Sequence, residues 1–178
     1  MRALLDHLAE QREVLRAAVE RVPVAMRERR PAPDRWSAAE VLEHLGIVEG
    51  RLTAMLSKVV ESAPQRAAPP AEERVIDRGF LKHLANRNIK IESRDTSRPS
   101  GGLDAAAAWA VLQSTRSGLL AVVHAAENVD LSAFKHPHPI FGPLDVFEWL
   151  VFVGGHEARH AAQIEEIGET LSASRESK

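Results

Sequence analysis

Two histidines four residues apart, His156 and His160, are the side chains of this sequence best suited to chemistry. On an α-helix, residues at this spacing lie one above the other, with Cβ atoms about 5–6 Å apart. Two imidazoles placed in this way can bind one metal ion, each at about 2.0–2.1 Å. A single histidine facing a core is often a satisfied structural residue, but a pair at this spacing is less easily explained in that way. The pair therefore favours a metal site over a purely structural role.

The histidine pair lies in a long helical pattern that the sequence predicts from Asp145 to about Leu171. Asp145 and Glu148 resemble a capping box, with aspartate in the usual place of serine or threonine. Apolar residues recur with the helical period of 3.6 on the same side as the two histidines. These residues are Val146, Trp149, Leu150, Val153, Ile164 and Ile167. The helix is therefore predicted to point both imidazoles into the core of a bundle.

Two helices are predicted in the first third of the chain. The first covers residues 3–30, and Pro23 should bend or divide it because proline removes an internal hydrogen bond. The second opens at Ser37, which with Glu40 has the spacing of a capping box, and its apolar stripe continues to Val59. Both segments carry charged residues on the face opposite their apolar stripe, as amphipathic helices of a bundle do.

The middle of the chain predicts one more long helix after an extended connection. Residues 62–103 are interrupted by proline and glycine, with a short helical pattern over 75–91 between the two loops. A long helix over 104–128 follows, with an aspartate as its N-cap. Residues 136–143 contain three prolines, too many for a helix or a central strand. We therefore predict an all-α protein without β-strands, in which the long connection can cross the bundle.

A third histidine is available on the second helix, where His44 lies about 60° from the centre of the apolar stripe. Taken alone, His44 is better explained as a histidine at the edge of a core. Beside His156 and His160 it becomes the natural third ligand. For His138 in the proline-rich segment, a place over the open end of the bundle and a rigid turn are equally good interpretations.

Composition sets the limits of the chemistry. The 178 residues are 44% hydrophobic and 27% charged, a length and composition that predict one domain over residues 1–178. The formal net charge of −2 predicts no nucleic-acid partner. No apolar run approaches the ~20 residues of a membrane-spanning helix, so we expect a cytoplasmic protein without a membrane partner. Cysteine is absent. Any metal must therefore take nitrogen and oxygen ligands, and any thiol must come from outside.

Several short motifs in this order resemble the DinB/YfiT-like superfamily of proteins described as metal-dependent enzymes. They are Trp36-Ser37 with Glu40 and His44-Leu45, His138-Pro139 with Gly142, and His156-x-x-x-His160 with Gln163. The resemblance covers nearly the whole chain and implies a four-helix bundle of up-down-down-up topology, with a long connection between helices two and three. It also implies a divalent metal, zinc or nickel, held by one histidine of helix two and two of the last helix. By position these are His44, His156 and His160.

The resemblance says less about the reaction than about the metal. Members with an assigned activity include bacillithiol or glutathione S-transferases and a mycothiol-dependent maleylpyruvate isomerase. This implies a metal-dependent transferase or hydrolase of small molecules, with a low-molecular-weight thiol as co-substrate. A homodimer is the assembly to test for. The alternative from another class is a non-catalytic bundle in which the metal is structural.

Glu157 leaves two interpretations open. His156-Glu157-x-x-His160 matches the H-E-x-x-H signature of zinc metalloproteases, in which the glutamate is the general base. The other metalloprotease features are missing, so a protease is the weaker hypothesis. Glu157 could act as a catalytic base, or it could hydrogen-bond a residue that binds the metal. A salt bridge across the bundle to Arg116 is slightly favoured over both. We also expect Gln163 to hydrogen-bond a ligand, and Arg159 to face outward.

Overall fold

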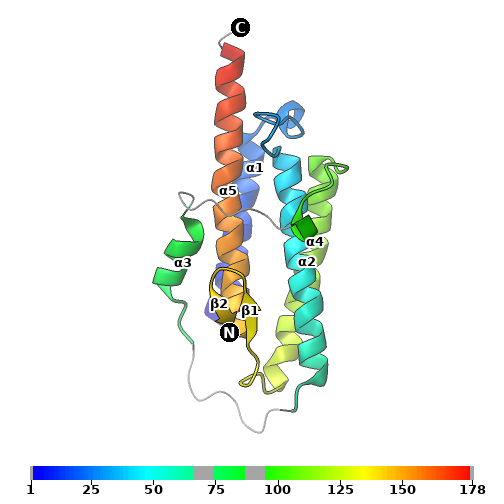
Figure 1. Cartoon of the computed structure of the whole chain (residues 1–178), viewed down its shortest axis with the longest axis vertical. Coiled ribbons are helices and arrows are strands. Elements are labelled where there is room, and N and C mark those ends of the chain that lie inside the picture. Colours follow the sequence, from blue (N-terminus) through cyan, green and yellow to red (C-terminus); the bar gives the residue numbers. More distant parts are fainter. Residues whose placement is uncertain (1, 66–73, 87–94, 177–178) are drawn as a thin grey trace.

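Four long helices form the body of the computed structural model, which describes residues 2–65, 74–86 and 95–176 (Figure 1). They are α1 (Arg2–Arg21), α2 (Ala38–Ser62), α4 (Ala105–Ala125) and α5 (Val146–Glu176). Helices α1 and α5 run in one direction and pack on each other, whereas α2 and α4 run in the opposite direction and pack on each other. This is the up-down-down-up four-helix bundle that the sequence predicted.

Side-chain caps start three of the four long helices where the sequence predicted them. The Ser37 hydroxyl accepts a hydrogen bond from the Glu40 backbone N–H at 3.1 Å, and the Glu40 carboxylate accepts from the Ser37 N–H at 2.8 Å. Asp145 and Glu148 form the same reciprocal pair at the start of α5. The Asp104 carboxylate caps α4. Each cap satisfies backbone N–H groups that the first helical turn leaves without a partner.

The first helix is shorter than predicted. It ends at Arg21, before Pro23, and a 3₁₀ turn (η1, Val24–Met26) follows. Proline lacks an N–H and disfavours helical geometry in the residue before it, so the helix stops there instead of bending.

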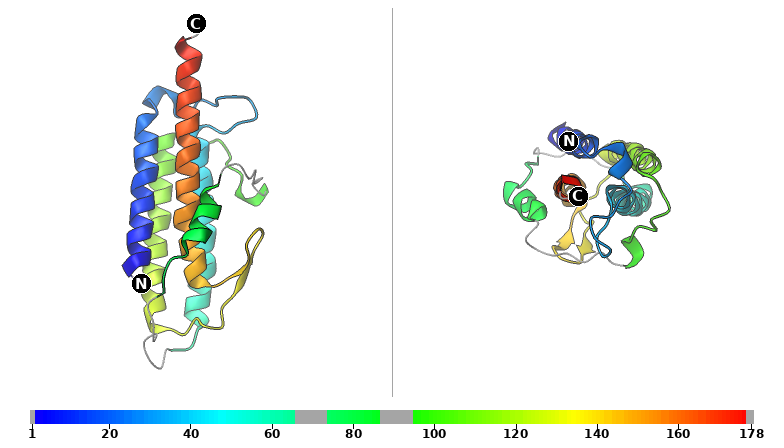
Figure 2. Two further views of the ribbon diagram at one scale, coloured as in Figure 1. Left: turned by 90° about the vertical axis from the view of Figure 1, so that its left-hand side faces the viewer. Right: turned by 90° about the horizontal axis from the view of Figure 1, so that it is seen from above.

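The long connection between α2 and α4 carries a short helix that packs on α5. This helix, α3, spans Arg78–Ala85, and the 3₁₀ turn η2 (Asp95–Ser97) precedes α4 (Figure 2). The prediction had extended the short helix over residues 75–91, of which 87–91 lie outside the described residues. The connection returns to the end of the bundle where α2 begins, so α4 runs in the same direction as α2.

A small hairpin next to α5 contradicts the prediction that the chain has no strands. Strands β1 (His136–His138) and β2 (Gly142–Leu144) are antiparallel, and Pro137 lies opposite Pro143. Two facing prolines fit only a non-hydrogen-bonded pair of the ladder, whose N–H groups would point away from the partner strand, so the missing N–H groups remove no hydrogen bond between the strands. Gly142 has a φ of +73°, which a glycine adopts readily at a tight turn.

Two apolar core clusters lie along the bundle, one above the other. The first includes Leu15, Leu45, Leu112 and Ile164, and the second includes Leu8, Leu52, Leu119 and Val153. A layer of charged side chains, described below, lies between them. None of the helices that the structure describes is long and apolar enough to cross a membrane.

Candidate metal centre

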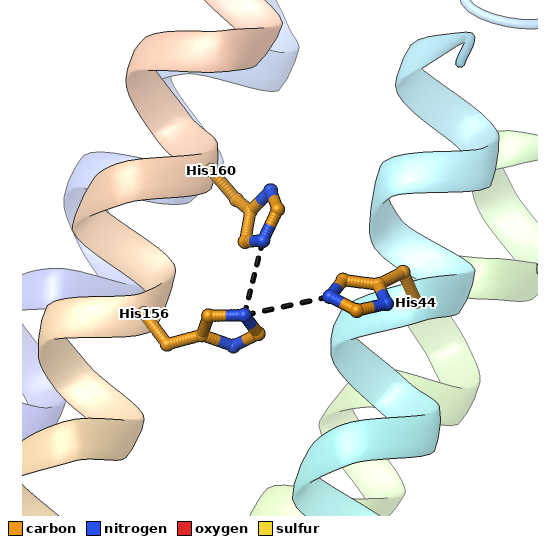
Figure 3. Close-up of side chains that lie close together, drawn as sticks. All are labelled: His44, His156 and His160. Carbon is orange, nitrogen blue, oxygen red and sulfur yellow. Dashed lines mark hydrogen bonds between the residues drawn. The ribbon is translucent and has the colours of Figure 1, made fainter. Parts of the chain in front are cut away.

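Three imidazoles meet between α2 and α5 (Figure 3). The Nε2 atom of His156 lies 3.0 Å from that of His160 and 3.4 Å from that of His44. The ligand atoms of the three side chains all lie within 4.8 Å of one another. The structure thus brings together the three histidines that the sequence singled out, and His138 is not part of the group.

Carbonyl oxygens determine which ring nitrogen carries the proton in two of the histidines. His44 Nδ1 lies 2.7 Å from the Ser97 carbonyl oxygen, and His160 Nδ1 lies 2.8 Å from Gln163 Oε1. A carbonyl oxygen only accepts hydrogen bonds, so each Nδ1 must donate. The Nε2 atoms of His44 and His160 therefore present lone pairs to the centre, which is the form in which histidine binds a metal.

The group of nitrogen atoms fits a cation better than it fits hydrogen bonding within the chain. His156 Nε2 has two lone-pair acceptors beside it, and a single N–H cannot be directed at both. One divalent ion between the three nitrogens would satisfy all of them. Imidazole is a preferred ligand of zinc and nickel, so the donor set suits either ion.

Burial favours the neutral form of His44 and His156. The pKa of His156 lies well below its ordinary value, because its ring is desolvated and because protonated His160 or His44 would repel a second positive charge. Burial also lowers the pKa of His44, which the Ser97 carbonyl offsets in part. A low pKa favours metal binding because a metal competes with protons for the same lone pair.

Aromatic rings on both sides hold the imidazoles in place. Phe152 stacks on His156 with centroids 5.2 Å apart and planes 18° from parallel. Trp36 contacts the ring of His44 at 5.0 Å. Trp36 and Phe152 are also walls of the cavity next to the histidines.

A cavity of about 1030 Å³ opens beside the three histidines, all of which line it. Its apolar walls come mainly from α2, α5 and the hairpin, and include Trp36, Val48, Leu52, Met55, Phe141, Trp149 and Phe152. Charged side chains also border it, namely Asp34, Arg35, Arg51, Arg159 and Glu166. A pocket of this size that combines apolar walls with polar and charged groups can hold a small molecule.

Glu157 lies in a buried cluster of four charged side chains, one from each long helix. Its Oε1 accepts from Arg12 Nε at 2.7 Å, and Arg116 Nη2 lies 3.0 Å from its Oε2. Glu49 completes the cluster by pairing with both arginines. The salt bridge to Arg116, one of the two interpretations of the sequence, is therefore present.

The pairing of Glu157 is incomplete at one oxygen. The contact between Arg116 and Oε2 is an ion pair without the alignment of a hydrogen bond, and no residue that the structure describes donates one to this oxygen. Burial accordingly raises the pKa of Glu157, although Arg116 and Arg12 oppose the shift. Because Glu157 does not line the cavity, we assign it no catalytic step.

Three outcomes concern the other residues near the site. Gln163 accepts a hydrogen bond from His160, as expected from its place one turn after that residue. Arg159, which helical phase placed outward, instead lines the cavity and donates to the Asn86 carbonyl oxygen. Ser97 escaped prediction because it acts through its backbone carbonyl, which carries no signal in the sequence.

Comparisons with known proteins point to one family. A family model described as the DinB superfamily matches residues 7–164. The uncharacterized protein YuaE of Bacillus subtilis (strain 168) is 29% identical over 147 residues, which cover 80% of this chain and 83% of that protein. The crystal structure of TT2238, a four-helix bundle protein, aligns with a TM-score of 0.56 at 20% identity, covering 92% of this chain and 97% of that one. This last similarity concerns the fold alone.

Proposed function

Since the chain belongs to the DinB superfamily, whose model covers residues 7–164, we propose that it is a divalent-metal-dependent enzyme acting on a small molecule. The reaction class is transfer or hydrolysis, and a low-molecular-weight thiol is the first co-substrate to test. The convergence of three Nε2 atoms beside a cavity of about 1030 Å³ is the observation that supports this proposal most directly.

A three-histidine site favours catalysis over a purely structural role. Structural zinc sites are closed by four protein ligands, whereas catalytic sites hold three and leave a position open. Among the residues that the structure describes, only these three side chains form a group with metal-ligand geometry. The cavity borders the same three imidazoles, so a substrate could reach the open position.

Each residue of the site has a separate task in this proposal. His44, His156 and His160 would hold the ion, while Ser97 and Gln163 keep two of the rings in the binding tautomer. The bound cation would supply Lewis acidity and lower the pKa of a coordinated water or thiol. The aromatic walls of the cavity would lower the local dielectric beside this position, which would strengthen electrostatic interactions there.

The metal content of the purified protein tests the proposal. Untagged protein from metal-replete medium should contain about one zinc or nickel ion per chain by elemental analysis. His44→Ala should lose most of the metal, because two imidazoles remain where three are needed. His124→Ala is the control, since the His124 side chain is exposed near the C-terminal end of α4 and does not line the cavity. Wild-type protein that neither contains nor takes up an ion, or a His44→Ala variant of unchanged affinity, would contradict the assignment.

The reaction class needs an activity screen. Metal-loaded protein should be tested against a panel of electrophiles with and without bacillithiol, mycothiol or glutathione, with His156→Ala as the inactive control. Turnover that requires both the metal and a thiol would assign a thiol transferase. Turnover that requires only the metal would assign a hydrolase.

A further inference from the structure

We propose that Glu43 is a positioning residue of the metal centre: it holds residues 97–101 against α2, so that the Ser97 carbonyl oxygen stays at His44 Nδ1. This inference rests on the proposed function in one respect, that His44 binds the ion. It assigns a task to a buried carboxylate that is neither a member of the three-histidine group nor a wall of the cavity.

Glu43 accepts three hydrogen bonds from the end of the long connection. Its Oε1 accepts from the Ser100 backbone N–H at 2.8 Å and from the Ser100 hydroxyl at 2.6 Å, and its Oε2 accepts from the Gly101 N–H at 3.1 Å. Hydrogen bonds to a carboxylate are roughly twice as strong as those between neutral groups. Glu43 is only 8% exposed, so water competes little for its oxygens. The carboxylate therefore fixes Ser100 and Gly101 on α2.

Two consecutive residues of α2 hold the two ends of the same short segment. Glu43 binds residues 100 and 101, while His44 Nδ1 donates to the Ser97 carbonyl oxygen at 2.7 Å. Pro99 lies between these two points, and proline restricts its own φ as well as the backbone of the residue before it. A displacement of residues 100 and 101 would therefore carry the Ser97 carbonyl with it.

The Ser97 carbonyl matters to the metal centre because it determines the tautomer of His44. While the carbonyl accepts from Nδ1–H, the Nε2 atom of His44 keeps the lone pair that a cation needs. Without this acceptor, the neutral ring can carry its proton on Nε2 and lose that lone pair. Thr96 and Ser97 also line the cavity, so the same stretch of chain borders the substrate in this proposal.

A purely structural role for Glu43 predicts a different result. If Glu43 only fastens the connection to the bundle, its removal should lower the free energy of unfolding but leave the His44 ring and the metal affinity of the folded protein unchanged. Glu28 offers a matched control. It also accepts from a backbone N–H at the start of α4, that of Ala105 at 3.0 Å, and this bond lies outside residues 97–101.

Proton–nitrogen correlation spectra of the histidine rings test the positioning role without any ion. In chelated, metal-free protein, wild-type His44 should be the Nδ1–H tautomer, whereas Glu43→Ala should show a mixture of both tautomers. Glu43→Gln should lie between them, because its side-chain oxygen can still accept from Ser100 but its amide cannot accept from Gly101. Glu28→Ala should keep the wild-type spectrum.

Competition with a chromophoric chelator measures the effect on zinc affinity, at a temperature at which circular dichroism shows every variant folded. The affinity should fall about tenfold in Glu43→Ala, the lower end of the range for losing a partner behind a metal ligand. Glu43→Gln should recover part of this loss. Glu28→Ala should bind zinc as tightly as the wild-type protein.

The outcomes separate this inference from the metal assignment. An unchanged Nδ1–H signal of His44 in Glu43→Ala, or equal zinc affinities of Glu43→Ala and Glu28→Ala, would overturn the inference. If Glu43→Ala does not fold, a Glu43→Gln variant with the wild-type spectrum and affinity would overturn it instead. Wild-type protein that binds no zinc would contradict the proposed function, and the metal-free spectra would still decide whether Glu43 keeps Ser97 at His44.

Discussion

At the level of single residues, we expect metal affinity to depend on the hydrogen bonds at Nδ1 of the imidazoles as well as on the imidazoles themselves. Ser97 and Gln163 each accept a hydrogen bond from an Nδ1–H group and thereby leave Nε2 of His44 and His160 available to a cation. Removing such a partner lets the ring rotate and change tautomer. Loss of such a partner should therefore reduce metal affinity more than it reduces the free energy of unfolding.

Gln163→Met should weaken metal binding by about 10–100-fold, the usual cost of losing a partner behind a metal ligand. Methionine keeps the length of the side chain but offers no carbonyl oxygen to accept the hydrogen bond from His160 Nδ1. Competition with a chromophoric chelator would measure the affinity. Gln113→Met, the same change at an exposed position of α4, is the matched control. Equal affinities in the two variants would show that Gln163 does not orient His160.

The metal-free protein should lose stability as the pH falls below about 6.5. Burial lowers the pKa of His7, His44 and His156 from 6.5 in the folded state. Below pH 6.5 the unfolded chain therefore binds more protons than the folded one, so the free energy of unfolding declines, by up to about 1.4 kcal/mol per pH unit for each additional proton.

Urea unfolding with a chelator present, at about pH 7.5 and pH 5.5, would measure this loss. Glu157 contributes with the opposite sign, because burial raises its pKa. Comparison with His156→Asn isolates the histidine contribution, and this variant should lose less stability over the same interval. A loss as large as that of the wild-type protein would exclude His156 as a source of the pH dependence.

At the level of the helices, a layer of charge separates the two apolar clusters of the bundle. Arg12 of α1, Glu49 of α2, Arg116 of α4 and Glu157 of α5 contact one another in this layer. Two positive and two negative charges compensate each other, which is the condition for burying them. The layer connects all four helices at one height, so it opposes sliding of α5 against α2, the two helices that carry the histidines.

Glu157→Gln should lower the free energy of unfolding by about 3–5 kcal/mol, because it leaves two buried arginines with the single carboxylate of Glu49 and therefore one positive charge uncompensated. The variant should still bind about one metal ion per chain, since all three histidines remain. Glu165→Gln, the same change in an exposed ion pair of α5 with Arg21, should cost less than about 1 kcal/mol. Loss of the ion from folded Glu157→Gln protein would instead assign Glu157 to the metal centre.

Gly154 lets α1 approach α5 closely. A Cβ atom at this position would overlap the buried His7 ring, lying 2.7 Å from its Cδ2. Gly154→Ala should therefore destabilise the bundle by about 1–3 kcal/mol, although alanine is the better helix former. At Gly118 of α4 a Cβ would lie 3.6 Å from Thr53, an ordinary contact, so Gly118→Ala should be neutral or stabilising. Thermal unfolding of both variants checks the contrast.

At the level of the whole molecule, two apolar clusters and the helix caps stabilise the bundle independently of any ion. The residues of these clusters come from all four long helices, and most of them are less than a tenth exposed. On the proposed function, an ion bound to this scaffold would add stability without being required for folding. Small domains built around a structural metal instead unfold when the metal is removed.

Chelation should lower the melting temperature while leaving the helical circular dichroism unchanged at room temperature. An ion that binds only the folded state contributes about 2.7 kcal/mol at a hundredfold excess over its Kd, and this amount is lost when the ion is removed. EDTA titration followed by circular dichroism and a thermal scan would measure both quantities. Loss of helical signal at room temperature would mean that the metal is part of the fold, as the structural alternative requires.

The sequence by itself determined the features that depend on neighbours along the chain. Helix caps at Ser37, Asp104 and Asp145 follow from local hydrogen bonding, and the pairing of His156 with His160 follows from the helical repeat. Only the tertiary structure decided which groups meet across helices. It added Arg12 to the expected pair of Glu157 with Arg116, turned Arg159 into the cavity wall and placed the Ser97 carbonyl behind His44. Such contacts depend on packing between distant segments, and in the case of Ser97 on a backbone atom that every residue carries.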